Sequence, residues 1–265
     1  MLCYGGLALL QPISPQLVIT IIVLTAAAFI GGALNALAGG GSLVTFPALL
    51  FAGLNPIVAN ASSVVALFPS TFTSVWAYRR SMAGVKEVSV TALAVTSAIG
   101  GLAGALLLLW TPTAVFAELV PWLVLLATTI FAVGNFAPLD VIRRLALGPR
   151  AALIVHFVIS VYGGYFGGGI GFLMLAALTL FGMRDINAMN GLKMALVGVM
   201  TATSIVAFVF AGVIRWWEVL PMIPAAMVGG YVAAHAAQRF DQRLIKGLVI
   251  VLGIAVTAYF FWKGV

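Results

Sequence analysis

Two triple-glycine segments carry the spacing that most clearly indicates chemistry in this sequence. Gly39–Gly41 and Gly167–Gly169 lie 128 positions apart, and each precedes an apolar run of about 11–13 residues. Such a run reaches roughly half of a bilayer at 1.5 Å per residue, so it has to begin at membrane depth. The first turn of a helix carries unpaired N–H groups and the positive end of the helix dipole, and glycine lets an anion approach them closely. The pattern therefore predicts an anion site made of two helix starts near the membrane midplane.

The candidate site consists of these turns and of polar side chains near them. Asparagine is costly to bury in a membrane helix and is therefore favoured as a ligand, whereas Ser and Thr commonly bond to their own backbone. The predicted substrate-binding residues are Gly39, Gly40, Gly41, Ser42, Asn60, Gly167, Gly168, Gly169, Asn190 and Lys193. The alternative is that the glycines only allow close packing of helices.

Two ionisable residues lie inside apolar segments. Lys193 comes eight residues after Asp185, roughly 12 Å into its predicted helix. At that depth it would attract an anion or exchange a proton, unless it snorkels back to the interface. His156 is a candidate for proton coupling, and the alternative is a hydrogen-bonded core histidine. Carboxylates are almost absent from the apolar segments, which argues against a cation pathway.

The composition excludes a soluble protein. Hydrophobic residues make up 63% and charged residues 7% of 265 residues, against about 45–50% and about 25% in soluble domains. A net charge of +7 would suit nucleic acid, but the Lys and Arg residues form short clusters between apolar runs. That distribution is typical of cytoplasmic loops, so the expected partner is the lipid bilayer and not nucleic acid. A single cysteine, Cys3, cannot form a cysteine-based metal cluster, and we expect neither a metal nor a cofactor.

Continuous apolar runs predict an all-α polytopic membrane protein, since helices satisfy their own backbone in lipid. The predicted segments are Leu17–Ala38, Leu43–Gly53, Ile57–Tyr78, Val88–Trp110, Val115–Phe136, Ala151–Tyr165, Ile170–Gly182, Ile186–Ile214, Val219–Gln238 and Leu244–Trp262. We expect residues 1–137 to form a first membrane repeat, 138–150 a cytoplasmic linker, and 151–265 a second repeat of about five helical segments.

The two halves are predicted to be copies of each other, because four glycine landmarks recur in the same order at offsets of 128 or 129. These are the triplets, Gly53 with Gly182, Gly84 with Gly212, and Gly100-Gly101 with Gly229-Gly230. Five crossings per half invert the halves and place ten of the counted Lys and Arg residues on one side, against two on the other. Re-entrant short runs with parallel halves give eight against four. The positive-inside rule favours inverted repeats with both termini outside.

The stretch Gly31–Pro47 resembles the signature of the sulfite exporter TauE/SafE family. The resemblance continues through Gly53 before Asn55-Pro56, Ala59 with Ser62-Ser63, Tyr78-Arg79-Arg80, and the weaker copy Phe166–Gly169 with Gly182 before Ala188. The second half departs from the pattern: Leu175 stands where the first half has Pro47, and Gly191-Leu192 replaces Ser62-Ser63.

This resemblance implies a secondary carrier that exports sulfite, organosulfonates or related sulfur oxyanions across the bacterial inner membrane. The glycine turns by themselves indicate only an anion. An anion channel on the same scaffold is the first alternative. An intramembrane serine protease with Ser42 as nucleophile is another, although Ile170 stands at the matching position and a serine nucleophile needs a base within reach. The substrate, the coupling ion and homo-oligomer formation stay open.

Overall fold

The computed structural model describes residues 15–37, 39–80, 84–85, 88–136, 148–236 and 242–263. These residues form ten helices and no strand. The helices are α1 (Pro15–Leu37), α2 (Ser42–Phe51), α3 (Pro56–Tyr78), α4 (Val90–Trp110), α5 (Thr113–Phe136), α7 (Pro149–Tyr165), α8 (Ile170–Leu180), α9 (Ile186–Phe210), α10 (Trp216–Ala236) and α11 (Gln242–Lys263). Cys3 and residues 138–147 of the predicted linker lie outside the described residues.

The helices agree with the predicted apolar segments to within a few residues. Six described helices, α1, α3, α4, α5, α9 and α10, are long and apolar enough to cross a membrane. The largest difference is at α9, which ends at Phe210 and not at Ile214. Gly212 takes a φ of +66° in the turn that follows, and this backbone conformation stops the helix. The all-helical, multi-pass architecture is therefore confirmed.

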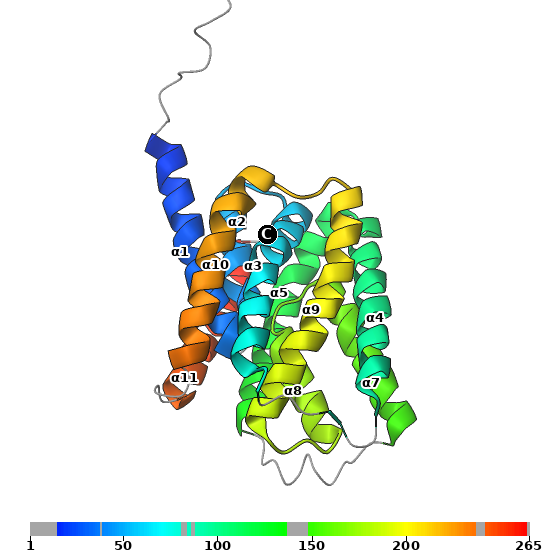
Figure 1. Ribbon diagram of the computed structural model, residues 1–265. Coiled ribbons are helices and arrows are strands. Elements are labelled where there is room, and N and C mark those ends of the chain that lie inside the picture. Colours follow the sequence, from blue (N-terminus) through cyan, green and yellow to red (C-terminus); the bar gives the residue numbers. More distant parts are fainter. Residues whose placement is uncertain are drawn as a thin grey trace, which may run out of the picture.

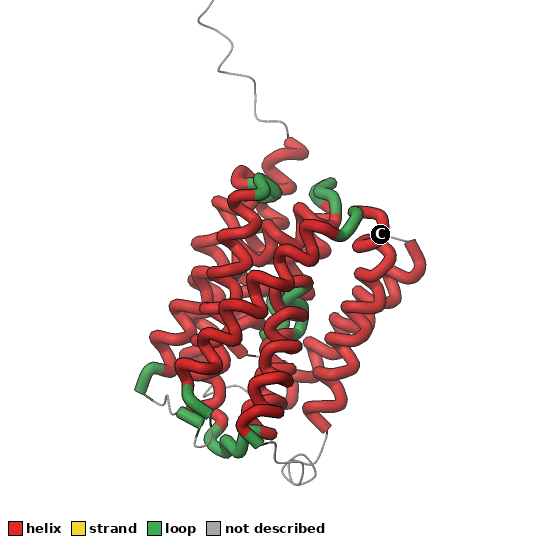
Figure 2. Tube along the Cα trace, turned by 90° about the vertical axis from the view of Figure 1, so that its right-hand side faces the viewer, coloured by secondary structure: helices red, strands yellow, loops and turns green. Residues whose placement is uncertain are grey.

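The short helices α2 and α8 are the returning arms of two helical hairpins. In Figure 1, α1 enters the bundle from the upper end and α2 returns toward it, whereas α7 enters from the lower end and α8 returns there. The glycine turns at the hairpin tips lie in the middle of the bundle, where Figure 2 shows loop segments between helices. Sequence reasoning counted these segments among five crossings per half. With only 10 and 11 residues, α2 and α8 are too short to cross.

Contacts between the two halves come in matching pairs. α1 packs along α10 and α7 packs along α4, while α3 contacts α10 and α9 contacts α4. Glycines allow these helices to approach closely: a Cβ added at Gly32 would lie 2.1 Å from the Ala226 oxygen, and one at Gly164 would lie 2.2 Å from the Gly101 oxygen. For these glycines the explanation is therefore helix packing.

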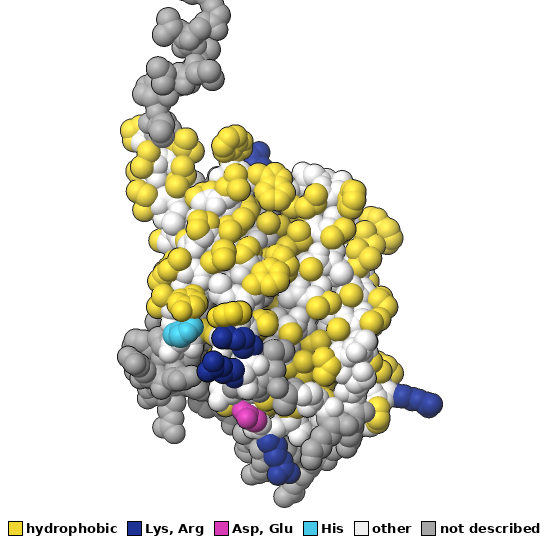
Figure 3. Space-filling view, in the orientation of Figure 1, with side chains coloured by type: hydrophobic (Ala, Val, Ile, Leu, Met, Phe, Trp, Pro, Cys, Tyr) yellow, Lys and Arg dark blue, Asp and Glu magenta, His cyan; other side chains and the backbone are white. Residues whose placement is uncertain are grey.

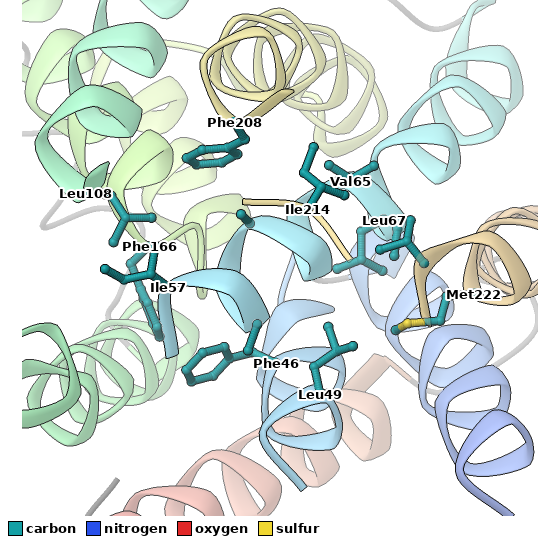
Figure 4. Packing of buried hydrophobic residues seen from close by; sticks show 14 of the residues in the cluster. Phe46, Leu49, Ile57, Val65, Leu67, Leu108, Phe166, Phe208, Ile214 and Met222 are labelled. Atoms are coloured by element: carbon teal, nitrogen blue, oxygen red, sulfur yellow. The ribbon is translucent and has the colours of Figure 1, made fainter. Parts of the chain in front are cut away.

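The hairpin tips are surrounded by a buried hydrophobic core. Phe46 of α2 packs edge-to-face on Phe166 in the α7–α8 turn, with ring centroids 5.8 Å apart, and both belong to the cluster in Figure 4. The surface is mainly hydrophobic on the face seen in Figure 3, with Lys and Arg mostly toward the lower end. Apolar side chains on both inside and outside are what a bilayer requires of a spanning bundle.

Candidate functional site

The two glycine turns meet each other directly. The N–H of Gly171, in the first turn of α8, donates a hydrogen bond to the carbonyl oxygen of Gly39, with an N···O distance of 3.4 Å. Gly39 has a φ of +75°, and a Cβ there would lie 2.3 Å from the Gly171 Cα atom. Glycine is required at Gly39 both by the backbone conformation and by this close approach. The structure thus brings the two predicted helix starts together.

The start of α2 has free backbone donors. The first backbone bonds in this region run from Leu43 to the Gly40 oxygen and from Val44 and Thr45 to the Gly41 oxygen. No side chain caps the helix, and within the described residues the N–H groups of Gly40, Gly41 and Ser42 have no acceptor. Buried N–H groups without acceptors are rare in folded proteins, and a bound anion is one way to satisfy them.

The start of α8 differs, because its first N–H groups are already engaged. Ile170 donates to the Gly167 oxygen at 3.4 Å, Gly171 to Gly39, and Phe172 to the Gly169 oxygen at 3.0 Å. The Tyr162 hydroxyl also donates to the Gly168 oxygen at 2.9 Å, which fixes this turn to α7. The two turns are therefore similar in backbone shape but unequal in the donors that they offer.

A cavity with a mixed apolar and polar wall lies beside the α2 start, between the hairpin tips and the central parts of α3 and α9. Its interior offers about 40 Å³ to the centre of a water-sized sphere. It is lined by Asn35, Ser42, Val64, Leu67, Phe68, Thr71, Gly163, Gly167, Ile170, Val197, Met200, Thr201 and Ser204. Ser42 and Gly167 are the predicted site residues among them. The other glycines of the triplets are not among the residues that line the cavity.

Asn60 is buried, with 1% of its surface exposed, and connects the two halves outside the cavity lining. Its Nδ2 donates to the carbonyl oxygen of Tyr165, the last residue of α7, at 3.1 Å. Its Oδ1 is buried without a hydrogen-bond partner among the described residues. Asn60 therefore caps the end of α7, close to the second glycine turn.

Lys193 is fully buried, at 0% exposure, so it does not snorkel to the interface. Its Nζ donates to Asn190 Oδ1 at 3.0 Å. Neither residue lines the cavity, but Lys193 lies one helical turn before Val197, which does. The matching residue of the first half, Val64, also lines the cavity. The buried ammonium group thus lies on the same stripe of α9 as the cavity wall.

His156 lies at the interface between α7 and α4. Its Nε2 is 2.8 Å from the Ser97 hydroxyl and 3.1 Å from the Leu93 oxygen, and its Nδ1 is buried without a partner among the described residues. His235 contacts the Tyr231 oxygen. Ser42 has no hydrogen bond to either histidine, so the geometry does not provide the base that a serine nucleophile needs.

Sequence reasoning missed two polar residues of the cavity. Thr201 has no hydrogen-bond partner in the described part of the chain, and Asn35 bonds through Nδ2 alone, to Ser70. By contrast, the Thr71 and Ser204 hydroxyls bond to backbone oxygens of Phe68 and of Gly101 and Met200. A signal for Asn35 was present, since it lies four residues before Gly39, whereas nothing in the sequence distinguished Thr201 from other helix threonines.

A bundle of apolar helices with two hairpins, and a cavity with polar side chains in its wall at their tips, is the architecture of a multi-pass membrane transporter. The family model of the sulfite exporter TauE/SafE matches residues 24–260. The chain belongs to the TauE/SafE family, which is a family of transporters and not of enzymes.

Bacterial relatives agree with this assignment. The probable membrane transporter protein ORF9 of Sinorhizobium sp is 30% identical over 233 residues, covering 87% of this chain and 88% of the relative. The probable membrane transporter protein YfcA of Escherichia coli K12 is 26% identical over 242 residues, covering 89% and 87%. A probable membrane transporter protein of Haemophilus influenzae is 28% identical over 243 residues, covering 89% and 92%. No solved structure matches the chain.

Proposed function

We propose that this protein is a secondary carrier that exports sulfite or a related sulfur oxyanion across the bacterial inner membrane. The observation that carries the proposal is the uncapped start of α2, where the N–H groups of Gly40, Gly41 and Ser42 have no acceptor among the described residues, beside a cavity with polar side chains in its wall. The family description supplies the sulfur oxyanion, and the relatives are bacterial. Low dielectric around the cavity strengthens the attraction between the helix dipole and an anion.

The carrier mechanism rests on an inverted repeat of residues 1–137 and 151–265. The opposite entry of the two hairpins, the paired contacts of α1 with α10 and α7 with α4, and equal positive φ angles at Gly39 and Gly167 support this proposal. Arg79, Arg80, Arg150 and Arg184 follow or precede helix ends at the lower side of Figure 1, which we assign to the cytoplasm. Lys86, Arg143, Arg144 and Arg239, also counted for orientation, lie outside the described residues.

Alternating access requires the halves to move about a shared site, and the hairpin tips are the shared element. Gly39 and Gly171 join the tips, and Asn60 joins α3 to the end of α7. Lys193 lies one turn from the cavity, where its charge would attract an anion that approaches along α9. Proton coupling through His156 and direct contacts of Asn60 and Asn190 with the substrate stay predictions.

Flux measurements in liposomes test this proposal. Purified protein is reconstituted, and sulfite efflux is followed with unlabelled sulfite, sulfate or acetate on the opposite side. A carrier gives saturable flux and counterflow with sulfite. An anion channel gives larger flux that neither saturates nor shows counterflow. Sulfite flux equal to that of protein-free liposomes would contradict both.

A further inference from the structure

The orientation of one cavity amide is fixed by its neighbours. Asn35 Nδ2 donates to the Ser70 hydroxyl oxygen at 3.2 Å. Ser70 uses its own proton in a 2.6 Å bond to the Leu67 carbonyl oxygen, so its oxygen is left to accept. The amide nitrogen of Asn35 must therefore face Ser70, and the carbonyl oxygen Oδ1 must face the other way.

Because Nδ2 is engaged by Ser70, Oδ1 is the amide atom of Asn35 that is left for the cavity. Asn35 lines the cavity and is 8% exposed. Oδ1 has no hydrogen-bond partner among the described residues, and it is not among the polar atoms that protein encloses completely. An amide oxygen accepts hydrogen bonds and cannot donate one. The cavity therefore contains a fixed acceptor, which is unusual for a site that takes a negatively charged ligand.

The remaining free groups of the cavity can all donate hydrogen bonds, although the hydroxyl groups among them can also accept. The hydroxyl groups of Ser42 and Thr201 have no partner among the described residues, and neither oxygen is fully enclosed. The N–H groups of Gly40 and Gly41 lie beside Ser42. Lining residues include no Lys, Arg or His, so the wall provides dipoles but no formal positive charge. A doubly charged anion would be poorly compensated in such a cavity.

We propose that the cavity selects a singly charged sulfur oxyanion that carries its own hydrogen-bond donor, which Asn35 Oδ1 accepts while Ser42, Thr201 and the α2 start bind its oxygens. Hydrogen sulfite and sulfonates with an N–H or O–H group have this chemistry, whereas sulfite dianion and alkyl sulfonates do not. The inference rests on the proposed function, since it specifies the ligand of the same site. An anion without a donor leaves Oδ1 buried and unpaired, which weakens its binding.

Sulfamate and methanesulfonate are a matched pair of probes. Both are tetrahedral monoanions of similar size, but sulfamate has an NH₂ group where methanesulfonate has a methyl group. Titration calorimetry on the purified full chain is expected to give about tenfold tighter binding of sulfamate. Ser70→Ala releases the Asn35 amide, which can then turn Nδ2 into the cavity. This variant should therefore bind sulfamate and methanesulfonate about equally. Asn35→Leu removes the acceptor and abolishes the preference as well.

The control is Ser74→Ala. Ser74 is a buried serine on the same helix, one turn after Ser70, and its hydroxyl donates to the backbone carbonyl oxygen of Ser70 at 2.9 Å, with no hydrogen bond to Asn35 among the described residues. The Ser74→Ala variant should keep the tenfold preference for sulfamate over methanesulfonate. Equal binding of the two probes by the unmodified protein, or a preference that survives in Ser70→Ala and Asn35→Leu, would overturn the proposed selection. Sulfite binding in the same experiment would leave the carrier proposal standing, whereas failure of sulfite and both probes to bind would overturn both.

Discussion

The carbonyl oxygen of Gly39 accepts a hydrogen bond from the N–H of Gly171, and this single contact joins the tips of two hairpins that enter from opposite ends of the bundle. It also makes the two helix starts unequal. The start of α8 loses one of its free donors to Gly39, whereas at the start of α2 the N–H groups of Gly40, Gly41 and Ser42 have no acceptor in the part of the chain that the structure describes. The proposed anion site therefore belongs mainly to the first turn, with the second turn as its support.

The contact predicts that Gly39 is far less tolerant of substitution than another glycine with the same backbone conformation. Gly39→Ala places a Cβ 2.3 Å from the Gly171 Cα atom, whereas Gly53, with a φ of +88°, has nothing within 4 Å. Gly39→Ala and Gly53→Ala should each lose about 1–2 kcal/mol of folding free energy because alanine disfavours positive φ. Gly39→Ala should lose more stability than the Gly53 variant and should also lose sulfite binding. Melting in detergent, with and without sulfite, measures both effects. Equal melting temperatures for the two variants would contradict a close contact between the turns.

Ser42 should matter for binding and not for folding. Its hydroxyl has no partner among the described residues, so Ser42→Ala should weaken sulfite binding by about tenfold without lowering the melting temperature. Ser204→Ala is the control, since Ser204 also lines the cavity but bonds to the Gly101 and Met200 oxygens. That control should lose stability and keep most of its affinity. If calorimetry finds the reverse order of affinities, Ser42 is not a ligand.

Substitutions of Lys193 and of Asn190 are expected to change the stability of the protein in opposite directions. Lys193→Met removes a buried charge that has one hydrogen bond, so stability should stay equal or rise, while sulfite flux falls. Asn190→Leu leaves the Lys193 amino group buried without that partner and should lose about 1–3 kcal/mol of stability. Arg79→Met, at the exposed end of α3, is the flux control. If Lys193→Met and Arg79→Met give the same sulfite flux, Lys193 has no part in transport.

Proton coupling through His156 predicts a separation between driven transport and exchange. His156→Gln keeps polar atoms at the α4–α7 interface, but the glutamine amide cannot take up and release a proton. Uptake driven by a proton gradient should be lost, while sulfite counterflow at equal pH persists. Ser97→Ala removes only the neighbouring hydroxyl, 2.8 Å from Nε2, and should retain both activities at reduced stability. Gradient-driven uptake by His156→Gln would leave His156 with a structural role.

Much of the fold could be predicted from hydropathy and glycine spacing, because membrane helices need long apolar runs and half-length helices need glycine turns. The end of α7 at Tyr165 was predicted as well, whereas the return of α2 and α8 to the ends from which α1 and α7 enter was not, because the sequence analysis favoured five crossings per half. Within the site, Ser42 and Gly167 followed from their positions next to the turns. The engagement of α8 by Gly39 and the orientation of Asn35 by Ser70 arise from contacts between distant segments, which no local pattern encodes.

The central claim, that the anion binds at the start of α2, is tested most directly by anomalous diffraction from crystals grown with selenite, the selenium analogue of sulfite. We predict one selenium peak in the cavity, within hydrogen-bond distance of Ser42 and of the N–H groups of Gly40 and Gly41. A selenium peak beside Lys193 and Asn190, or peaks on the surface with the cavity empty, would contradict the account.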